Sequence, residues 1–397
     1  MIDFDHYEVA ALSDPLPTLN ELRERCPVAK STAYGGFWNL FDYELVHAAA
    51  RDTDRLSSRQ TVIPQPEAMC FAAPPIQIDP PVHDDFRKPV LRFFSPHSVR
   101  ELDAAIRARA TQLIDEFIGS GEADLATQLC IPFPAEGAIR LLGLPPEDFP
   151  VFADWSVKIF RNDDLQDVMA NVLEYFGRYY DEAGDRTDDS IISVCRRLTI
   201  GGEPITRTDF SLFLMTLVAA GLDTTANAAA HIFIVLDEHP ALRTQLIEDP
   251  SRMPRAIEEL LRYLTPLPTL SRVARADMTI GESEIRQGEL VMLNWLAANH
   301  DPKEFRDPGE IDFDRAQNRH MAFGSGIHRC LGMHLARLEL RILLEEVLQR
   351  MPDYLVRHDD VLRVGGITRM VCSLPVRFTP GALSGSRNSA ASASANY

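Results

Sequence analysis

Lysine is scarce in this chain of 397 residues, which contains 4 lysines beside 36 arginines. Acidic residues number 58 and basic residues 40, so the formal net charge is −18. Binding to nucleic acid or to an anionic membrane depends on positive surface that neutralises phosphates. The charge balance therefore excludes both as expected partners.

Paired cysteines and nucleotide-binding glycines are also missing. The six cysteines include no C-x-x-C pair, which argues against a zinc site or an iron–sulfur cluster. We expect mostly buried thiols in a reducing compartment. None of the glycine fingerprints of dinucleotide-binding domains occurs.

Long apolar runs are absent from residues 1–26, where charges interrupt every hydrophobic segment. We therefore expect no signal peptide or membrane anchor, and we predict a soluble, cytoplasmic protein. The length and the 45% hydrophobic content suffice to bury a cofactor. We expect one catalytic domain over residues 1–380, followed by a flexible Gly/Ser/Ala-rich tail over residues 381–397.

Helical periodicity dominates the rest of the chain. The predicted helices span residues 17–26, 84–94, 99–120, 125–142, 149–184, 188–198, 206–239, 253–264 and 331–351. Predicted strands are a hairpin at 31–42 and segments at 271–280, 290–295, 363–372 and 374–378. The proline-rich segment 57–75 is predicted to be a loop. The pattern indicates a mainly α fold with a minor antiparallel β portion.

The most informative segment runs from Phe323 to Gly332 and reads FGSGIHRCLG. Gly324 and Gly326 permit a turn in which a Cβ would clash, and Gly332 lets the following helix approach a flat cofactor. The first amides of that helix favour a thiolate at Cys330, and Phe323 is placed to shield the sulfur from water. The segment is similar to the axial-thiolate loop of a heme enzyme. A buried cysteine at a helix start explains the whole pattern poorly.

Four further motifs accompany this segment. They are DPPVHDDFR at residues 79–87, AAGLDTT at 219–225, ELLR at 259–262 and IDFDR at 311–315. In order and spacing, the five motifs resemble those of soluble bacterial cytochromes P450, over almost the whole chain. The resemblance implies the cytochrome P450 fold, with heme b buried between the long central helix and the cysteine loop with its following helix.

The resemblance also implies how heme is held. Cys330 matches the proximal iron ligand, and Phe323, Gly332 and Ala220 match positions next to the cofactor. Heme carries two propionates, and buried carboxylates require Arg or His partners. The candidates by motif position are His83, Arg87, Arg272 and His328. His231, further along the long helix, is expected to be a core histidine instead of a ligand.

Asp223 and Thr224 form a polar pair inside an apolar helical run. One interpretation is local, because a threonine hydroxyl often bonds to a carbonyl one turn earlier and bends the helix. The favoured interpretation, from matching family positions, is that this bend opens a groove for dioxygen. Thr224 then holds oxygen and water, and Asp223 relays protons from solvent.

Glu259 and Arg262 lie three residues apart and could be an ordinary exposed pair. The resemblance instead places them in a buried structural network with Arg315. Residues expected to line the substrate pocket, under a roof formed by residues 59–71, are Ile76, Thr216, Ala219, Leu267, Thr269, Leu270, Ile367 and Thr368. This inventory favours a small or medium lipophilic substrate, such as a terpenoid or an aromatic compound.

We expect electrons to come from a separate protein, because the 67 residues after Cys330 are too few for a flavin reductase. The resemblance implies a ferredoxin and its NAD(P)H-dependent reductase as electron donors. Arg92, Arg329 and Arg337 could bind the acidic ferredoxin, or they could simply form a solvated face. The expected function is dioxygen-dependent hydroxylation by a heme-thiolate monooxygenase. A tailoring oxidase performing epoxidation, desaturation or coupling shares every motif. A heme protein that binds ligands without turnover has no need of the Asp-Thr pair.

Overall fold

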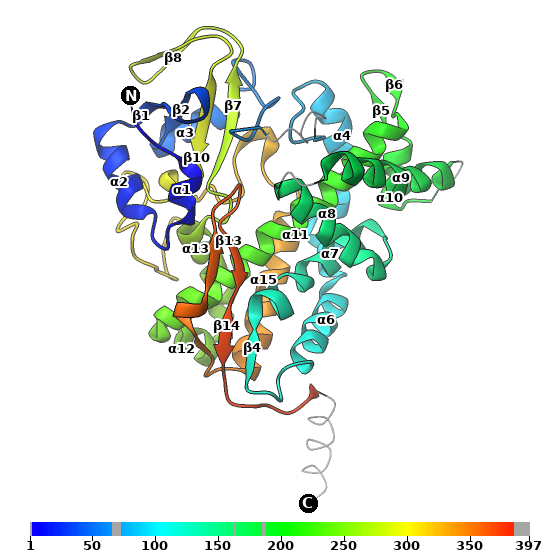
Figure 1. Ribbon diagram of the computed structural model, residues 1–397, viewed down its shortest axis with the longest axis vertical. Coiled ribbons are helices and arrows are strands. Elements are labelled where there is room, and N and C mark those ends of the chain that lie inside the picture. Colours follow the sequence, from blue (N-terminus) through cyan, green and yellow to red (C-terminus); the bar gives the residue numbers. More distant parts are fainter. Residues whose placement is uncertain (1, 66–72, 162–163, 185–187, 385–397) are drawn as a thin grey trace, which may run out of the picture.

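The computed structural model describes residues 2–65, 73–161, 164–184 and 188–384, and helices form most of this part of the chain (Figure 1). The α-helices are α1 (His6–Ala11), α2 (Leu16–Arg25), α3 (Tyr43–Arg51), α4 (Val82–Val90), α5 (Pro96–Arg100), α6 (Asp103–Asp115), α7 (Pro132–Leu142), α8 (Phe149–Arg161), α9 (Leu165–Ala183), α10 (Ile191–Arg196), α11 (Arg207–Glu238), α12 (Pro240–Glu248), α13 (Met253–Leu264), α14 (Trp295–Ala298) and α15 (Met333–Arg350). The strands are β1 (Val28–Ser31), β2 (Phe37–Leu40), β3 (Leu56–Ser57), β4 (Glu122–Asp124), β5 (Thr199–Ile200), β6 (Glu203–Pro204), β7 (Thr269–Ala274), β8 (Met278–Ile280), β9 (Ser283–Ile285), β10 (Leu290–Asn294), β11 (Leu355–Val356), β12 (Leu362–Val364), β13 (Met370–Ser373) and β14 (Pro375–Arg377). The mainly α architecture agrees with the predicted fold class.

The long helix α11 runs through the centre of the molecule, where it packs against α7, α9, α13 and α15 (Figure 1). It begins after Thr206, whose side chain accepts a hydrogen bond from the Asp209 N–H and so caps the first turn. Its length and a mean hydropathy of 1.3 would suffice to cross a membrane. However, 61% of its most apolar window is buried against other helices, so we interpret α11 as the core helix of the fold.

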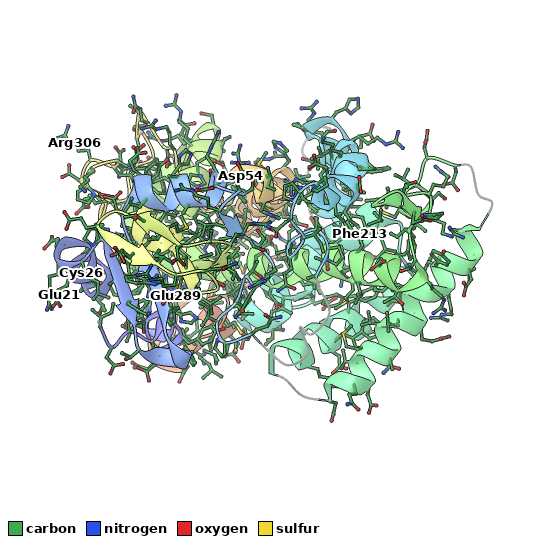
Figure 2. The ribbon with its side chains drawn as sticks, turned by 90° about the horizontal axis from the view of Figure 1, so that it is seen from above. Glu21, Cys26, Asp54, Phe213, Glu289 and Arg306 are labelled. Atoms are coloured by element: carbon green, nitrogen blue, oxygen red, sulfur yellow. The ribbon has the colours of Figure 1, made fainter. Side chains whose placement is uncertain are left out.

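Two hydrophobic clusters lie along α11. The first half contributes Phe213 and Leu214 to a cluster with α7, α8 and α9, and Figure 2 shows Phe213 among these helices. The second half contributes Phe233 and Leu236 to a cluster with α6, α13 and α15. The midpoint of α11 therefore lies between two packed cores, which hold it in place on both sides.

The largest sheet has the strand order β1-β2-β10-β7-β3 and lies with α1–α3 in the upper left part of Figure 1. Three of its pairings are antiparallel, as predicted, but β10 pairs with β2 in parallel. The two strands are separated by most of the chain, so the tight turn that favours antiparallel neighbours does not constrain them.

Several predicted elements differ from those observed. The hairpin predicted at 31–42 spans residues 28–40. The shift arises because apolar and polar residues do not alternate along the four residues of the edge strand β1, so its pattern does not mark where the strand begins. The helix predicted at 125–142 is a π-helical turn (Ala126–Cys130) followed by α7, since Pro132 lacks the N–H that would continue an α-helix. The segments 99–120 and 149–184 each contain two helices instead of one, and the short helices α1, α3, α12 and α14 were not predicted.

A buried ion network joins α13 to the segment that leads to the cysteine loop. The Glu259 carboxylate, 1% exposed, accepts hydrogen bonds from Arg262 at 2.8 and 2.9 Å and from Arg315 at 3.0 and 3.1 Å. Arg262 also donates to the carbonyl of Asn299 at 2.9 Å, and the Asn299 side chain accepts from the Met321 N–H at 2.6 Å. This chain of contacts ends two residues before Phe323.

Replacing Glu259 with glutamine should leave two buried guanidinium groups without a counter-ion. We expect the free energy of unfolding to fall by about 3–5 kcal/mol, measured by urea unfolding with far-UV circular dichroism. The control is Glu21→Gln, because Glu21 lies at the outer edge in Figure 2 and pairs with Arg25 while both side chains are exposed. A Glu259 variant as stable as the control would contradict the proposed structural role.

Candidate active site

A cavity of about 430 Å³ brings the chemically distinctive residues together. One wall is the middle of α11, with Ala220, Asp223 and Thr224. Another is the cysteine loop, with Phe323, His328, Cys330 and Gly332. Residues about 100 positions apart in the sequence thus face one cavity.

The middle of α11 presents Thr216, Ala219, Ala220, Asp223 and Thr224 to the cavity, at the spacing of one helical face. The Thr224 hydroxyl donates to the Ala220 carbonyl at 3.0 Å. This is the local bond that the first interpretation of Thr224 required. The helix nevertheless continues without interruption through this turn. The hydroxyl oxygen keeps acceptor lone pairs for a ligand in the cavity.

Asp223 is the titratable group of α11 that faces the cavity. Burial raises the pKa of its carboxyl from 3.8 to about 6. A carboxyl with this pKa is present in both protonation states near neutral pH, so it can accept and donate protons. One turn later, the Asn227 side chain donates to the Asp223 carbonyl at 2.8 Å and accepts from the Val371 N–H at 2.9 Å, which ties this part of α11 to β13.

Gly326 allows the cysteine loop to turn close to α3. Its φ is +74°, and a Cβ at this position would lie 2.6 Å from the Ala50 carbonyl oxygen. Within the loop, the Cys330 N–H donates to the Phe323 carbonyl at 2.8 Å. A Cβ on Gly332 would project into open space beside the cavity, which leaves room for a flat group.

Cys330 lies deep in the protein, but its side chain is accessible because it faces the cavity. Burial raises the pKa of its thiol. The Gly332 N–H and the guanidinium groups of Arg87, Arg337 and Arg329 act in the opposite direction. A bound metal cation would therefore be needed to make the thiolate the dominant form at neutral pH.

The four candidate carboxylate partners gather at one end of the cavity. Arg87, Arg272 and His328 line it, whereas His83 lies behind His328 with the two ring centroids 4.6 Å apart. Arg272 is 4% exposed and donates to the Ser271 carbonyl at 2.7 Å, and among the described residues no carboxylate lies within ion-pair distance of it. Burial lowers the pKa of Arg272 to about 10 and that of His328 to about 3.

This set of residues fits a ligand with two carboxylates. The Nε2 atoms of His83 and His328 are buried, and neither has a hydrogen-bond partner within the described part of the chain. The Arg87 side chain donates to the Arg329 carbonyl, at the edge of the cysteine loop. The buried Arg272, the partly buried Arg87 and two unpartnered ring nitrogens are costly unless an anion binds between them.

The predicted substrate-pocket residues are placed with one exception. Ile76, Leu267, Leu270, Ile367 and Thr368 all line the cavity, together with Thr216 and Ala219 of α11. Thr269 does not line it, because successive residues of β7 alternate and the face of Leu270 and Arg272 is the one that meets the cavity. Residues 66–71 of the predicted roof lie outside the described residues.

Two predicted surface arginines are already engaged. Arg337 binds Glu258 through two hydrogen bonds, at 2.6 and 2.7 Å, and Arg92 pairs with Asp189 at 3.1 Å. Arg329 is exposed beside the cysteine. His231 is a buried core histidine, as predicted, because its Nε2 pairs with the Arg369 carbonyl at 3.0 Å.

The cavity-lining residues that sequence reasoning missed include Met169 and Glu339. Met169 comes from α9, for which no motif gave a signal. Glu339 of α15 is 2% exposed, and burial raises the pKa of its carboxyl well above the usual range although the Thr225 hydroxyl opposes this. Helical periodicity could have identified Glu339, since it shares a face with buried Leu335 four residues earlier.

Comparison with known proteins decides the family. The family model for cytochrome P450 matches residues 137–352. Cytochrome P450 130 of Mycobacterium tuberculosis is 30% identical over 387 residues, covering 92% of this chain and 95% of its own length. The chain belongs to the cytochrome P450 family. Cyclomarin C epoxidase of Salinispora arenicola is 32% identical, with 84% of this chain and 87% of the relative covered. The crystal structure of CYP101J2 superposes with a TM-score of 0.86 at 25% identity, covering 95% and 96% of the two chains.

Membership in the cytochrome P450 family makes the protein a monooxygenase that binds heme b. The cavity agrees with that cofactor on independent grounds. It has a cysteine on one wall, an apolar interior and, at one end, cationic and donor side chains that lack an anion. The predicted fold class is confirmed by the structural neighbours.

The raised pKa of Asp223 predicts a pH-dependent effect on stability. The folded protein favours the protonated carboxyl, so this carboxyl progressively loses its stabilising contribution as pH rises from 3.8 to about 6. Asp223→Asn should therefore gain stability relative to the native chain, by about 1 kcal/mol more at pH 7 than at pH 5. Urea unfolding at both pH values measures the difference. An equal gain at pH 5 and pH 7, or the same trend in the exposed control Glu203→Gln, would count against the assignment.

Proposed function

We propose that this cytochrome P450 hydroxylates a small or medium lipophilic substrate, using dioxygen and electrons from a ferredoxin. The observation that carries the proposal is the cavity that places Cys330 on one wall and Asp223 and Thr224 on another. Between them lie predominantly apolar side chains. A thiolate donor, a proton-relay pair and an apolar chamber are the three requirements for inserting oxygen into a C–H bond.

Cys330 is the proposed proximal ligand of the heme iron. When bound, heme b supplies the activation of dioxygen, and a thiolate ligand favours O–O cleavage over reversible oxygen binding. The hydrogen bond from the Cys330 N–H to the Phe323 carbonyl fixes the position of the sulfur. Phe323 lines the cavity beside it and limits the access of water.

Arg87, Arg272, His83 and His328 are the proposed partners of the heme propionates. The two arginines supply charge, and each histidine has a buried Nε2 that can donate once a carboxylate is present. A carboxylate within hydrogen-bond distance favours the protonated imidazole, so it should raise the lowered pKa of His328. Ala220 of α11 and Gly332 are small residues that leave the flat cofactor its space.

Asp223 and Thr224 are the proposed catalytic residues. Asp223 can hold a proton at its carboxyl and release it near neutral pH, as its pKa of about 6 allows. Thr224 accepts or donates through a hydroxyl that is held by the Ala220 carbonyl. The pair would thus deliver protons to the cavity one at a time, which a protein that only binds ligands would not require.

The substrate would occupy the part of the cavity lined by Ile76, Leu267, Leu270, Ile367 and Thr368. A terpenoid or an aromatic compound satisfies an apolar lining that carries few hydroxyl groups. Epoxidation is a second candidate reaction, favoured by the likeness to the epoxidase of Salinispora arenicola. Analysis of products distinguishes the two reactions, since both use the same residues.

The electron donors are proposed to be a ferredoxin and its NAD(P)H-dependent reductase, in the cytoplasm. Arg329 is exposed next to Cys330, where an acidic ferredoxin would approach within electron-transfer distance. Residues 1–380 are proposed to form one heme domain. Of the tail over 381–397, residues 385–397 lie outside the described residues.

The Cys330→Ser variant tests the ligand. In the wild type, the reduced protein with carbon monoxide should show the strongly red-shifted Soret band of a thiolate-ligated heme. The variant should lose this band completely, whereas Cys26→Ser should retain it. Terpenoids and aromatics titrated into the ferric wild type should produce a high-spin shift. A thiolate band that survives in Cys330→Ser would refute the assignment.

The Thr224→Ala variant tests proton delivery. Without the hydroxyl, proton delivery should fail and the reduced dioxygen should be released as hydrogen peroxide. The amount of product per NAD(P)H consumed should therefore fall by about tenfold or more while hydrogen peroxide rises. Thr216→Ala is the matched control, because Thr216 faces the same cavity and also donates to a carbonyl one turn earlier, at 2.8 Å. Unchanged coupling in Thr224→Ala would remove this residue from the mechanism.

A further inference from the structure

Two neighbouring acids on α13 point to different parts of the molecule. Glu259 enters the buried network described above, whereas Glu258, about 100° further round the helix, faces α15 and the cysteine loop. Glu258 is not among the proposed heme-binding or catalytic residues. Its contacts nevertheless lead directly to the residues around Cys330.

The Glu258 carboxylate binds two cationic or donor side chains. Arg337 of α15 donates from Nε and Nη2 at 2.6 and 2.7 Å, in the planar fork that holds a guanidinium in one orientation. His320 contacts the same carboxylate through Nε2 at 3.1 Å. The His320 Nδ1 accepts from the Ala322 N–H at 3.2 Å, so in the neutral ring Nε2 carries the proton and donates it to Glu258.

Both partners of Glu258 touch Phe323. The Arg337 guanidinium lies 4.5 Å from the centroid of the Phe323 ring, in a cation–π contact. The His320 ring lies 6.0 Å from the same ring at an interplanar angle of 45°. The Phe323 carbonyl in turn accepts from the Cys330 N–H. The Glu258 carboxylate therefore fixes the two side chains that contact the Phe323 ring, and the Phe323 backbone is hydrogen-bonded to Cys330.

The charges of the pair stay fixed at neutral pH. Burial acts to raise the pKa of the Glu258 carboxyl, but the hydrogen bonds from Arg337 and His320 hold that pKa at about 2. The side chains of Arg337 and Glu258 are 27% and 31% exposed, so solvent screens them only in part.

We propose that Glu258 and Arg337 form a fixed charge pair that sets the electron density of the Cys330 sulfur, and thereby the reduction potential of the heme iron. Glu258 acts as a positioning residue, because it holds the guanidinium over Phe323. The inference rests on the proposed role of Cys330 as the iron ligand. It assigns Arg337 a function inside the protein instead of one in binding a ferredoxin.

The two charges should move the potential in opposite directions. Reduction adds one negative charge to the heme, which a nearby cation favours and a nearby anion opposes. Arg337→Gln should therefore make the potential more negative, and Glu258→Gln should make it more positive. We expect about a threefold change in the ferric–ferrous equilibrium for each, or about 28 mV at 59 mV per decade for one electron. The double variant should lie close to the wild type.

Spectroelectrochemical titration of the heme-loaded full chain measures these potentials. Arg319→Gln is the matched control, because Arg319 makes a fork of the same kind with Glu304, at 2.8 Å for both bonds, and its side chain is 66% exposed. Its potential should equal that of the wild type. If Arg337→Gln fails to retain heme, Arg337→Lys replaces it, and should shift the potential in the negative direction by a smaller amount.

Shifts of the same sign in the Glu258 and Arg337 variants would overturn the proposal, since a purely structural pair would admit water to the sulfur in either case. Potentials equal to the wild type in both variants would overturn it as well. The carbon monoxide spectrum of the wild type separates this result from a failure of the proposed function. A thiolate band without opposed shifts refutes only the charge pair, whereas a missing thiolate band refutes the ligand assignment.

Discussion

The carboxylate of Glu259 is the interaction on which the rest of the site depends. It is almost completely buried and neutralises Arg262 and Arg315 together. Arg262 then uses its remaining N–H groups to hold the carbonyls of residues 299, 308 and 310. An irregular segment without a hydrophobic core of its own is thereby kept in one conformation. A loop that is proposed to present a sulfur to a cofactor requires this support, because neither strand nor helix pairing provides it.

The opposite wall of the cavity is stabilised in another way. α11 lies between two hydrophobic clusters, which hold its ends, while its middle carries small and polar residues that fill less space. Packing of the ends makes it possible to leave the middle open. Burial beside the cavity raises the pKa of Asp223, so the property on which the proposed proton relay depends follows from the fold without a charged neighbour.

Much of this arrangement could be predicted from the sequence, because it is encoded locally. Long periodic runs indicate α11, α13 and α15, and closely spaced glycines indicate the cysteine loop. The predicted limits of the three helices differ from the observed ones by at most two residues. The predicted hairpin near the N-terminus was misplaced because its short strands are defined by their tertiary partners. The single helix predicted over 149–184 was wrong because Asp164, just before α9, has a φ of +48°, which an α-helix does not allow. The prediction that Thr269 lines the substrate pocket was wrong because the face on which a strand residue lies depends on how the strand pairs with its neighbour.

The contacts of Glu258 show where local reasoning ends. In the sequence, Glu258 and Glu259 are adjacent acids on one predicted helix, and only Glu259 belongs to a motif, so no pattern indicates a role for Glu258. In the fold, the two carboxylates point in different directions. Glu259 anchors the segment that leads to the cysteine loop, whereas Glu258 binds His320 and Arg337 beside that loop. Both are held by arginine forks, which constrain orientation as well as charge. The support of the cysteine loop and the proposed adjustment of its electrostatic surroundings thus originate from neighbouring residues in a single helical turn of α13.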